Sequence, residues 1–273
     1  GRAIFSGLFV NEAGEGFVCR FVAFNSAGIG VAWIDSDPFD VGVGEPYVIA
    51  ISTPVGRMHA GSVFDIPPVI SVQDKGGNVV ETYSEGRIEA TLVAAPGLGV
   101  LLPASEVSAD IRYGYAYFSS LYIKEAGIGY RLGFNATNLT SNLGGGSYVE
   151  STDFTVGIGP AYRLELEDDI LDGAIISGSP FEDQPRVRAY DLGDNILSSS
   201  ESAVLVSVLV NPAAATLWPT DRVMTEGVAT FSGLFLDRRG RNVKLRFSLF
   251  SFDRSSARWN ETDIHLDTDF FHV

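Results

Sequence analysis

The chain has 273 residues, of which 45% are hydrophobic and 19% are charged, a composition that supports a buried core and excludes intrinsic disorder. The formal net charge of −15 at pH 7 disfavours contact with phosphate backbones and anionic lipid headgroups, so we expect neither nucleic acid nor a membrane surface as a partner. The sequence has no apolar run of about eighteen residues, so we expect no membrane insertion. It opens with neither an initiator Met nor a signal segment, and we expect it to be a portion of a longer protein.

Three sequence markers recur along the chain. The segment 1–8, Gly-Arg-Ala-Ile-Phe-Ser-Gly-Leu, returns in similar form at 114–121 and 227–234, with a spacing of 113 residues each time. A Phe-x-Val strand end lies at 39–41, 154–156 and 271–273, with steps of 115 and 117 residues. The segment 61–79 matches 178–196 at a constant shift of 117 residues. Self-similarity at one fixed period predicts tandem repeats.

The order of these markers predicts the domain organisation. Residues 1–41 hold only the later markers and are expected to be the C-terminal half of a repeat, whereas 42–157 and 158–273 hold all of them and are expected to be complete repeats. The boundaries fall at Gly42–Pro46 and Gly157–Pro160, where Gly and Pro follow a strand directly. With almost no linker, adjacent repeats are expected to dock at a fixed angle.

The pattern within a repeat predicts an antiparallel β-sandwich. Apolar residues occupy alternate positions in the segments 17–21, 130–134 and 243–247, which places one face on a core and the other in water. The segments Asp74–Asn78 and Asp191–Asn195 lie between apolar runs and predict tight turns, because Asn and Gly tolerate a positive φ. Modules of about 115 residues with such frequent turns are typical of sandwiches.

These motifs resemble a known class of repeat. A Val-x-Asp-x-x-Gly-Asn-x-Val hairpin (72–80), a Gly-Val-Ala-Thr-Phe-Ser-x-Leu strand (227–234) and Gly-x-Gly-Tyr-x-Leu (127–132) look like the immunoglobulin-like repeats of bacterial adhesins and large eukaryotic surface proteins, and more loosely like filamin-type repeats. The resemblance implies an all-β fold of tandem immunoglobulin-like antiparallel β-sandwiches. It also implies a spacer, stalk, adhesive or filament role without catalysis. Tyr130 is similar in position to the tyrosine corner of immunoglobulin domains.

Three acceptor sequons begin at Asn135, Asn138 and Asn260. We expect N-glycans on them, and hence an extracellular or cell-surface location. Asn135 and Asn138 are expected at the end of a strand before a Gly-rich loop, and Asn260 in the corresponding connection of the last repeat. Because Asn135 and Asn138 are three residues apart, two glycans there would compete for space.

Cys19, the single cysteine, aligns with Leu132 and Leu245 on an inward strand position. A buried thiol that acts as a small hydrophobe is one reading, and a disulfide to the opposite sheet is the other. Acidic residues gather near each predicted repeat end, where either Ca²⁺ binding or a solvated acidic rim would account for them. These residues are Asp35, Asp37, Asp40, Glu150, Asp153, Asp267 and Asp269, with Glu167–Asp169 early in the last repeat.

No catalytic, cofactor or metal site is expected. His59, His265 and His272 occur singly, and hydrolase, metalloprotease and phosphate-loop motifs are absent from the sequence. The alternative to a structural role is an adhesin or a carbohydrate- or protein-binding module that uses Trp33, Trp218 and Trp259. Residues 1–41 cannot bury their apolar face alone, so we expect upstream repeats or neighbouring subunits to complete them.

Overall fold

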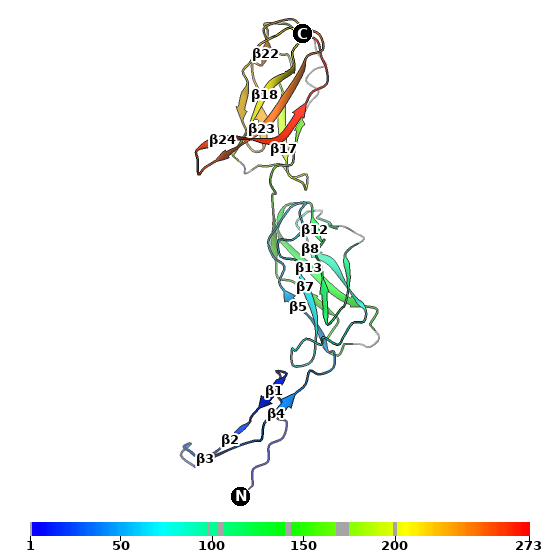
Figure 1. Cartoon of the computed structure of the whole chain (residues 1–273), viewed down its shortest axis with the longest axis vertical. Helices are drawn as coiled ribbons and strands as arrows, with labels where there is room; N and C mark the ends of the chain where they lie inside the picture. Colours follow the sequence, from blue (N-terminus) through cyan, green and yellow to red (C-terminus); the bar gives the residue numbers. More distant parts are fainter. Residues whose placement is uncertain (1, 98, 103–105, 140–142, 168–174, 199–200) are drawn as a thin grey trace.

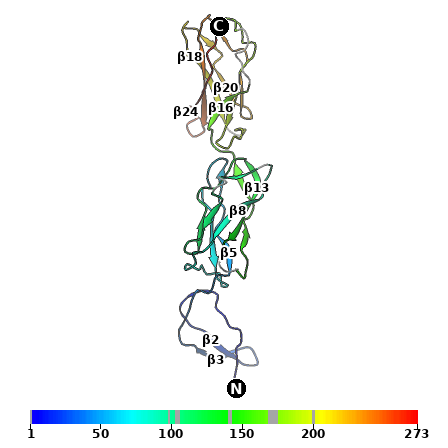
Figure 2. The same cartoon turned by 90° about the vertical axis from the view of Figure 1, so that its right-hand side faces the viewer.

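β-Strands are the only regular secondary structure longer than a turn in the part of the chain that the structure describes. The structure is a computed structural model that describes residues 2–97, 99–102, 106–139, 143–167, 175–198 and 201–273. Its strands form three bodies in a row along one long axis, with the N-terminus at one end and the C-terminus at the other (Figures 1 and 2). The prediction of an all-β fold is confirmed.

The N-terminal segment (residues 2–41) is an open, two-part ribbon. It contains β1 (Gly14–Phe17), β2 (Arg20–Phe24), β3 (Gly30–Asp35) and β4 (Phe39–Val41). β1 pairs with β4 and β2 pairs with β3, both antiparallel. None of its described residues is buried, in contrast to the two bodies that follow.

The first sandwich buries one continuous core between Ile49 and Val156. One sheet has the order β10-β8-β13-β15-β6 with β14 also on β13, a second has the order β11-β7-β5, and β12 pairs with β9. The pairing of β15 with β6 is parallel, which differs from the fully antiparallel expectation. The strands are β5 (Val48–Thr53), β6 (Met58–His59), β7 (Val69–Gln73), β8 (Arg87–Ala94), β9 (Leu101–Leu102), β10 (Ser108–Asp110), β11 (Tyr115–Tyr117), β12 (Tyr122–Ile123), β13 (Gly127–Thr137), β14 (Tyr148–Glu150) and β15 (Phe154–Gly157).

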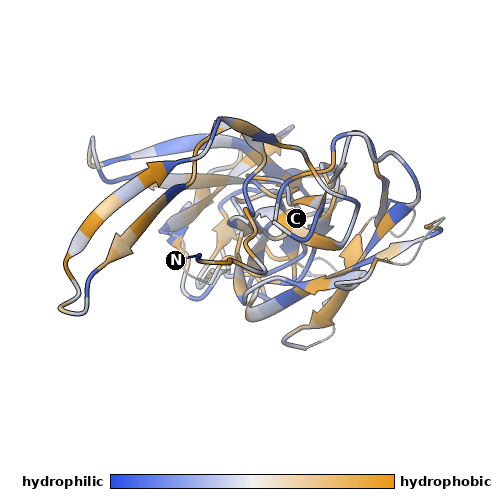
Figure 3. Ribbon diagram, turned by 90° about the horizontal axis from the view of Figure 1, so that it is seen from below, coloured by the Kyte–Doolittle hydropathy of each residue, from blue (hydrophilic) through white to orange (hydrophobic). Residues whose placement is uncertain are grey.

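The second sandwich buries a separate core between Leu164 and Phe271. Its sheets have the orders β16-β17-β21 and β20-β18-β23-β24, and β19 pairs with β22. The strands are β16 (Arg163–Leu166), β17 (Arg186–Tyr190), β18 (Ser202–Val210), β19 (Leu217–Trp218), β20 (Asp221–Val223), β21 (Val228–Thr230), β22 (Phe235–Leu236), β23 (Lys244–Asp253) and β24 (Arg258–Asp267). Two separate cores make two sandwiches. Hydrophobic and hydrophilic residues are interspersed along the ribbon (Figure 3).

The alternating segments form the central strand of each sandwich, β13 and β23. Leu132 and Phe134 on β13, and Leu245 and Phe247 on β23, are fully buried. The Tyr130 hydroxyl donates to the carbonyl of Glu125 at 2.8 Å, the backward hydrogen bond of a tyrosine corner. Burial of these apolar side chains is the main stabilising term for each sandwich.

One strand pairing has the same register in all three bodies. The partners are Arg20↔Asp35 in β2–β3, Gly133↔Glu150 in β13–β14 and Arg246↔Asp267 in β23–β24. After each pairing a hydroxyl residue bonds reciprocally with the backbone of the inward residue. Its side chain accepts from the N–H and its own N–H donates to the carbonyl in the pairs Cys19–Ser36, Leu132–Ser151 and Leu245–Thr268.

Candidate functional site: the two junctions

At the second junction, a tight turn of the second sandwich contacts the first sandwich. The turn 191–195 follows β17, and its last residue, Asn195, reaches the loop between β12 and β13. The side-chain amide of Asn195 donates to the carbonyl of Lys124 at 2.7 Å, and its oxygen accepts from the N–H of Ala126 at 2.9 Å. One amide side chain thus satisfies a donor and an acceptor of the neighbouring sandwich.

The carboxylate of Asp191 holds this turn and the connection between the sandwiches together. Asp191 Oδ1 accepts from the N–H groups of Gly193 and Asn195 at 2.9 and 2.8 Å. Asp191 Oδ2 accepts at 2.8 Å from the N–H of Gly159, which lies in the connection. Asp191 is fully buried, so these bonds replace the water that its charge has lost.

The first junction repeats this arrangement atom for atom. Asn78 donates to the carbonyl of Asn11 at 2.6 Å and accepts from the N–H of Ala13 at 2.9 Å. Asp74 Oδ1 accepts from Gly76 and Asn78, and Asp74 Oδ2 accepts from Gly44 at 2.8 Å. We call each set of contacts a clasp: residues 74–78 with Asn11, Ala13 and Gly44, and residues 191–195 with Lys124, Ala126 and Gly159.

Each clasp needs a glycine at its third turn position. A Cβ at Gly76 would lie 2.1 Å from the carbonyl oxygen of Asn11, and a Cβ at Gly193 would lie 2.1 Å from that of Lys124. Neither glycine has a positive φ, so the requirement is space for a neighbouring backbone rather than backbone conformation. The second junction adds an exposed ion pair of 3.9 Å between Lys124 and Asp194, which contributes little.

The charge of Asp74 is stabilised by the first clasp. Burial alone would raise the pKa of this carboxyl, but hydrogen bonds from Gly44, Asn78 and Gly76 outweigh burial and lower the pKa to about 2. Asp74 is therefore ionised at every physiological pH.

No family model and no curated protein matches the chain. Among solved structures, it is similar to the D00-D0 domain of intimin, with 14% identity, a TM-score of 0.37 and coverage of 82% of this chain and 98% of that one. It is also similar to domains 4–9 of the surface layer protein SbsC (13% identity, TM-score 0.28, 88% and 33% coverage) and to a β-glycosidase from Bacteroides vulgatus (11%, 0.25, 84% and 25%). At these TM-scores none of them carries an argument about function.

The sequon asparagines are exposed; Asn135 and Asn138 lie at the end of β13 as expected, whereas Asn260 does not lie where it was expected. Asn135 lies within β13, opposite Tyr148, and Asn260 lies within β24 rather than in a connection. Asn138 follows β13 with a φ of 54°. Thr140, the last residue of the sequon that begins at Asn138, lies outside the described residues.

Cys19 is a free thiol and is half-buried. Cys19 lies between β1 and β2 rather than on a strand, although it bonds with Ser36 as Leu132 does with Ser151. The partner sheet that buries Leu132 and Leu245 has no equivalent around Cys19 in the described residues.

The acidic residues near the predicted repeat ends are mostly paired with arginine. Asp35 pairs with Arg20, Asp267 with Arg246, and both Glu150 and Asp153 with Arg131. In the described ranges no group of three or more His, Cys, Asp or Glu residues lies close enough to hold a metal ion. Asp168 and Asp169 lie outside those ranges.

The histidines and tryptophans are dispersed. His59, His265 and His272 lie on β6, on β24 and beyond β24, and Trp33, Trp218 and Trp259 lie on β3, β19 and β24. Trp259 packs on Phe252 with ring centroids 5.2 Å apart. The described residues also contain no helix long and apolar enough to cross a membrane.

Sequence reasoning identified the residues 74–78 and 191–195 as turns but missed their contacts across the junctions. The signal was the shared Asp, Gly and Asn at the same three positions of both turns, which is more identity than a tight turn requires.

Proposed function

We propose that this chain is a non-catalytic structural segment of a large extracellular repeat protein, such as a surface filament, appendage or stalk. It would consist of half a repeat (1–41) and two complete immunoglobulin-like repeats (42–157 and 158–273). The observation that carries this proposal is the clasp, which occurs with the same residue types and the same hydrogen bonds at both junctions.

The clasp suits a spacer because it fixes one repeat on the next. Each clasp combines two side-chain hydrogen bonds across the junction with a buried carboxylate bonded to the connecting chain. Each such bond contributes about 0.5–1.5 kcal/mol net, and more where a charge takes part. Repetition of one junction geometry would build a rod whose length grows with the number of repeats, as in other repeat proteins.

The surface properties support an extracellular location. A net charge of −15 keeps a long protein soluble and repels anionic surfaces. Asn135, Asn138 and Asn260 are exposed, so their side chains are accessible for N-glycans.

Electron microscopy of the native material, with antibodies against residues 158–273 applied to intact source cells, tests this proposal. We expect labelling on the cell surface along extended structures in which successive sandwiches are evenly spaced. Intact-mass analysis before and after glycosidase treatment should give a mass loss. An isolated, unglycosylated globular monomer inside the cell would refute the extracellular structural role.

A further inference from the structure

The N-terminal segment exposes residues whose counterparts form the core of the first sandwich. Phe5 and Leu8 are 59% and 65% exposed, whereas Phe118 and Leu121, at the spacing of 113 residues, are 2% and 0% exposed. The same relation links further exposed or half-buried residues to buried counterparts. These pairs are Ala3 with Ala116, Val10 with Ile123, Phe17 with Tyr130, Phe21 with Phe134 and Ala23 with Ala136.

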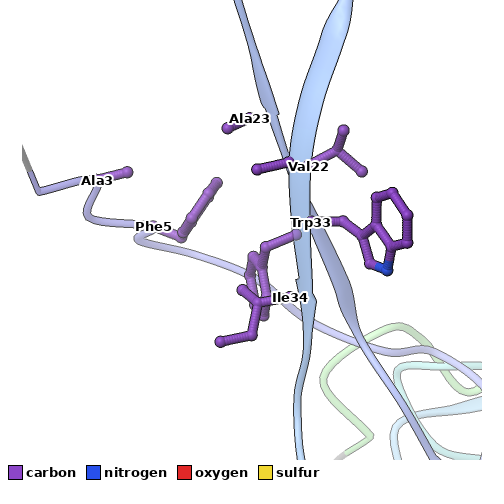
Figure 4. A pocket seen from close by; sticks show the side chains of 8 residues that line it. Ala3, Phe5, Val22, Ala23, Trp33 and Ile34 are labelled. Carbon is purple, nitrogen blue, oxygen red and sulfur yellow. The ribbon is translucent and has the colours of Figure 1, made fainter.

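The exposed side chains already have the geometry of a sandwich core. The ring centroids of Phe5 and Phe21 are 5.0 Å apart, compared with 5.3 Å for Phe118–Phe134 and 5.7 Å for Phe231–Phe247. Phe5 and Phe21, together with Ala3, Ala23 and Ile34, line an apolar groove of about 510 Å³. Figure 4 shows Phe5 and Ile34 on one side of the β2–β3 hairpin and Trp33 on the other.

One edge of β2 is open. In the first sandwich, β13 carries β14 on one edge and β8 on the other, where Leu132 faces Leu92 and Phe134 faces Ala90. β2 pairs only with β3, the counterpart of β14, among the described strands. The open edge is therefore where a strand like β8 would add, antiparallel to β2.

A second cavity, of about 730 Å³, lies at the first junction between the N-terminal segment and the first sandwich. Its lining includes Leu8, Val10 and Asp74. At the second junction the segment Met58–Gly61 lies in the corresponding place: Ala60 donates to Gly157 at 2.8 Å, and Gly61 donates to Ile123, the counterpart of Val10, at 2.8 Å. The N-terminal segment has no counterpart of β6, so the first junction is built only in part.

We propose that this open face is the docking site for the first half of another repeat of the same kind, joined to residues 1–41 in one polypeptide. The occupant would have the pattern of residues 42–113, with a β8-like strand on β2 and a β6-like segment in the cavity at the first junction. This inference rests on the proposed repeat architecture. A single segment would fill both vacancies, which are the groove over Phe5 and Phe21 and the cavity beside Leu8 and Val10.

A second copy of this chain is a poorer occupant than a joined segment. The first half of its own sandwich contributes Ile70, Val72 and Ile88, all 0% exposed, and these would have to leave their core to swap. A joined segment needs only a short turn, such as 112–114 between β10 and β11 in the first sandwich.

Hydrogen exchange of the backbone amides of β2 tests the proposal. The 273-residue chain is compared with a chain that carries a copy of residues 42–113 ahead of Gly1. We expect the β2 amides in the extended chain to exchange at least about 100-fold more slowly, because β2 becomes a central strand. The control extension has Ile88→Asp and Ala90→Asp in the copied segment and should give no protection.

Two results would overturn the proposal. One is β2 exchange that is equally fast with and without the extension. The other is protection of β2 in the 273-residue chain that rises with protein concentration, because that would make a second copy the occupant. Both results concern residues 1–41 alone. They would therefore refute the docking proposal without refuting the extracellular structural role, which the microscopy tests separately.

Discussion

Asp74 connects the charge state of one side chain to the first junction. Its folded-state pKa of about 2 lies below its ordinary value, so its ionised form stabilises the fold above about pH 4, and this contribution is lost as the pH falls towards 2. Asp74→Asn should lower the free energy of unfolding of the first sandwich at pH 7 by about 1.5–3 kcal/mol, because charged hydrogen bonds are lost.

The difference between wild type and Asp74→Asn should shrink between pH 4 and pH 2, as measured by urea unfolding at several pH values. Asp65→Asn, at an exposed position outside the junction, is the control and should change little. A difference between wild type and Asp74→Asn that is constant down to pH 2 would contradict the account.

Gly193 is required by the approach of a neighbouring backbone. Gly193→Ala should force the turn away from the Lys124 carbonyl, because the added methyl would lie 2.1 Å from that oxygen. We expect limited proteolysis to cut the connection near Gly157–Pro160 more rapidly in the variant. Gly42→Ala is the control and should leave the cleavage rate unchanged, because its added methyl has open space. If Gly193→Ala were cleaved no faster than Gly42→Ala, the clasp would tolerate a side chain at this position.

At the scale of the strands, residues at equivalent repeat positions should contribute differently to the free energy of unfolding in different bodies. Phe134 on β13 is fully buried, so Phe134→Ala should cost about 3–5 kcal/mol of the free energy of unfolding. Its counterpart Phe21 on β2 is only half-buried, and Phe21→Ala should leave chemical unfolding of both sandwiches unchanged. Equal costs for the two variants would mean that the N-terminal segment is already a closed core.

The sequence pattern predicted which strand residues are buried better than it predicted the lengths of hairpins and the sheets that cover each strand. Leu132, Phe134, Leu245 and Phe247 are buried as their alternation indicates, because a period of two needs only local information. Asn260 was expected in a connection, but β23 and β24 form a longer hairpin than β13 and β14 and enclose it within a strand. Cys19 is only half-buried because no second sheet covers it among the described residues, which the spacing of the markers does not report.

The clasps could not be predicted because they depend on contacts across the junctions. Asn78 and Asn195 contact backbone atoms that are more than sixty positions away, and no local pattern reports such contacts. Only the recurrence of Asp, Gly and Asn at the same positions of both turns was visible in the sequence.

At the scale of the whole molecule, the bodies lie in a row along one axis, and each clasp links two neighbouring bodies (Figure 1). Short connections limit the distance between bodies, but the hydrogen bonds of Asn78 and Asn195 limit their angle. The angle is what distinguishes a rod from a flexible string.

The most direct test measures the distance distribution between spin labels on exposed residues of the two sandwiches, at Thr152 and Ser251, in a Cys19→Ser background. We predict one narrow distribution for the wild type and a broad one for Asn195→Ala, which loses both hydrogen bonds across the second junction. Asn211→Ala is the matched control, since Asn211 makes the same two kinds of backbone hydrogen bond, to Ala215 within the second sandwich, and its distribution should stay narrow. A broad wild-type distribution, or one unchanged by Asn195→Ala, would contradict the claim that the clasps set the geometry of the rod.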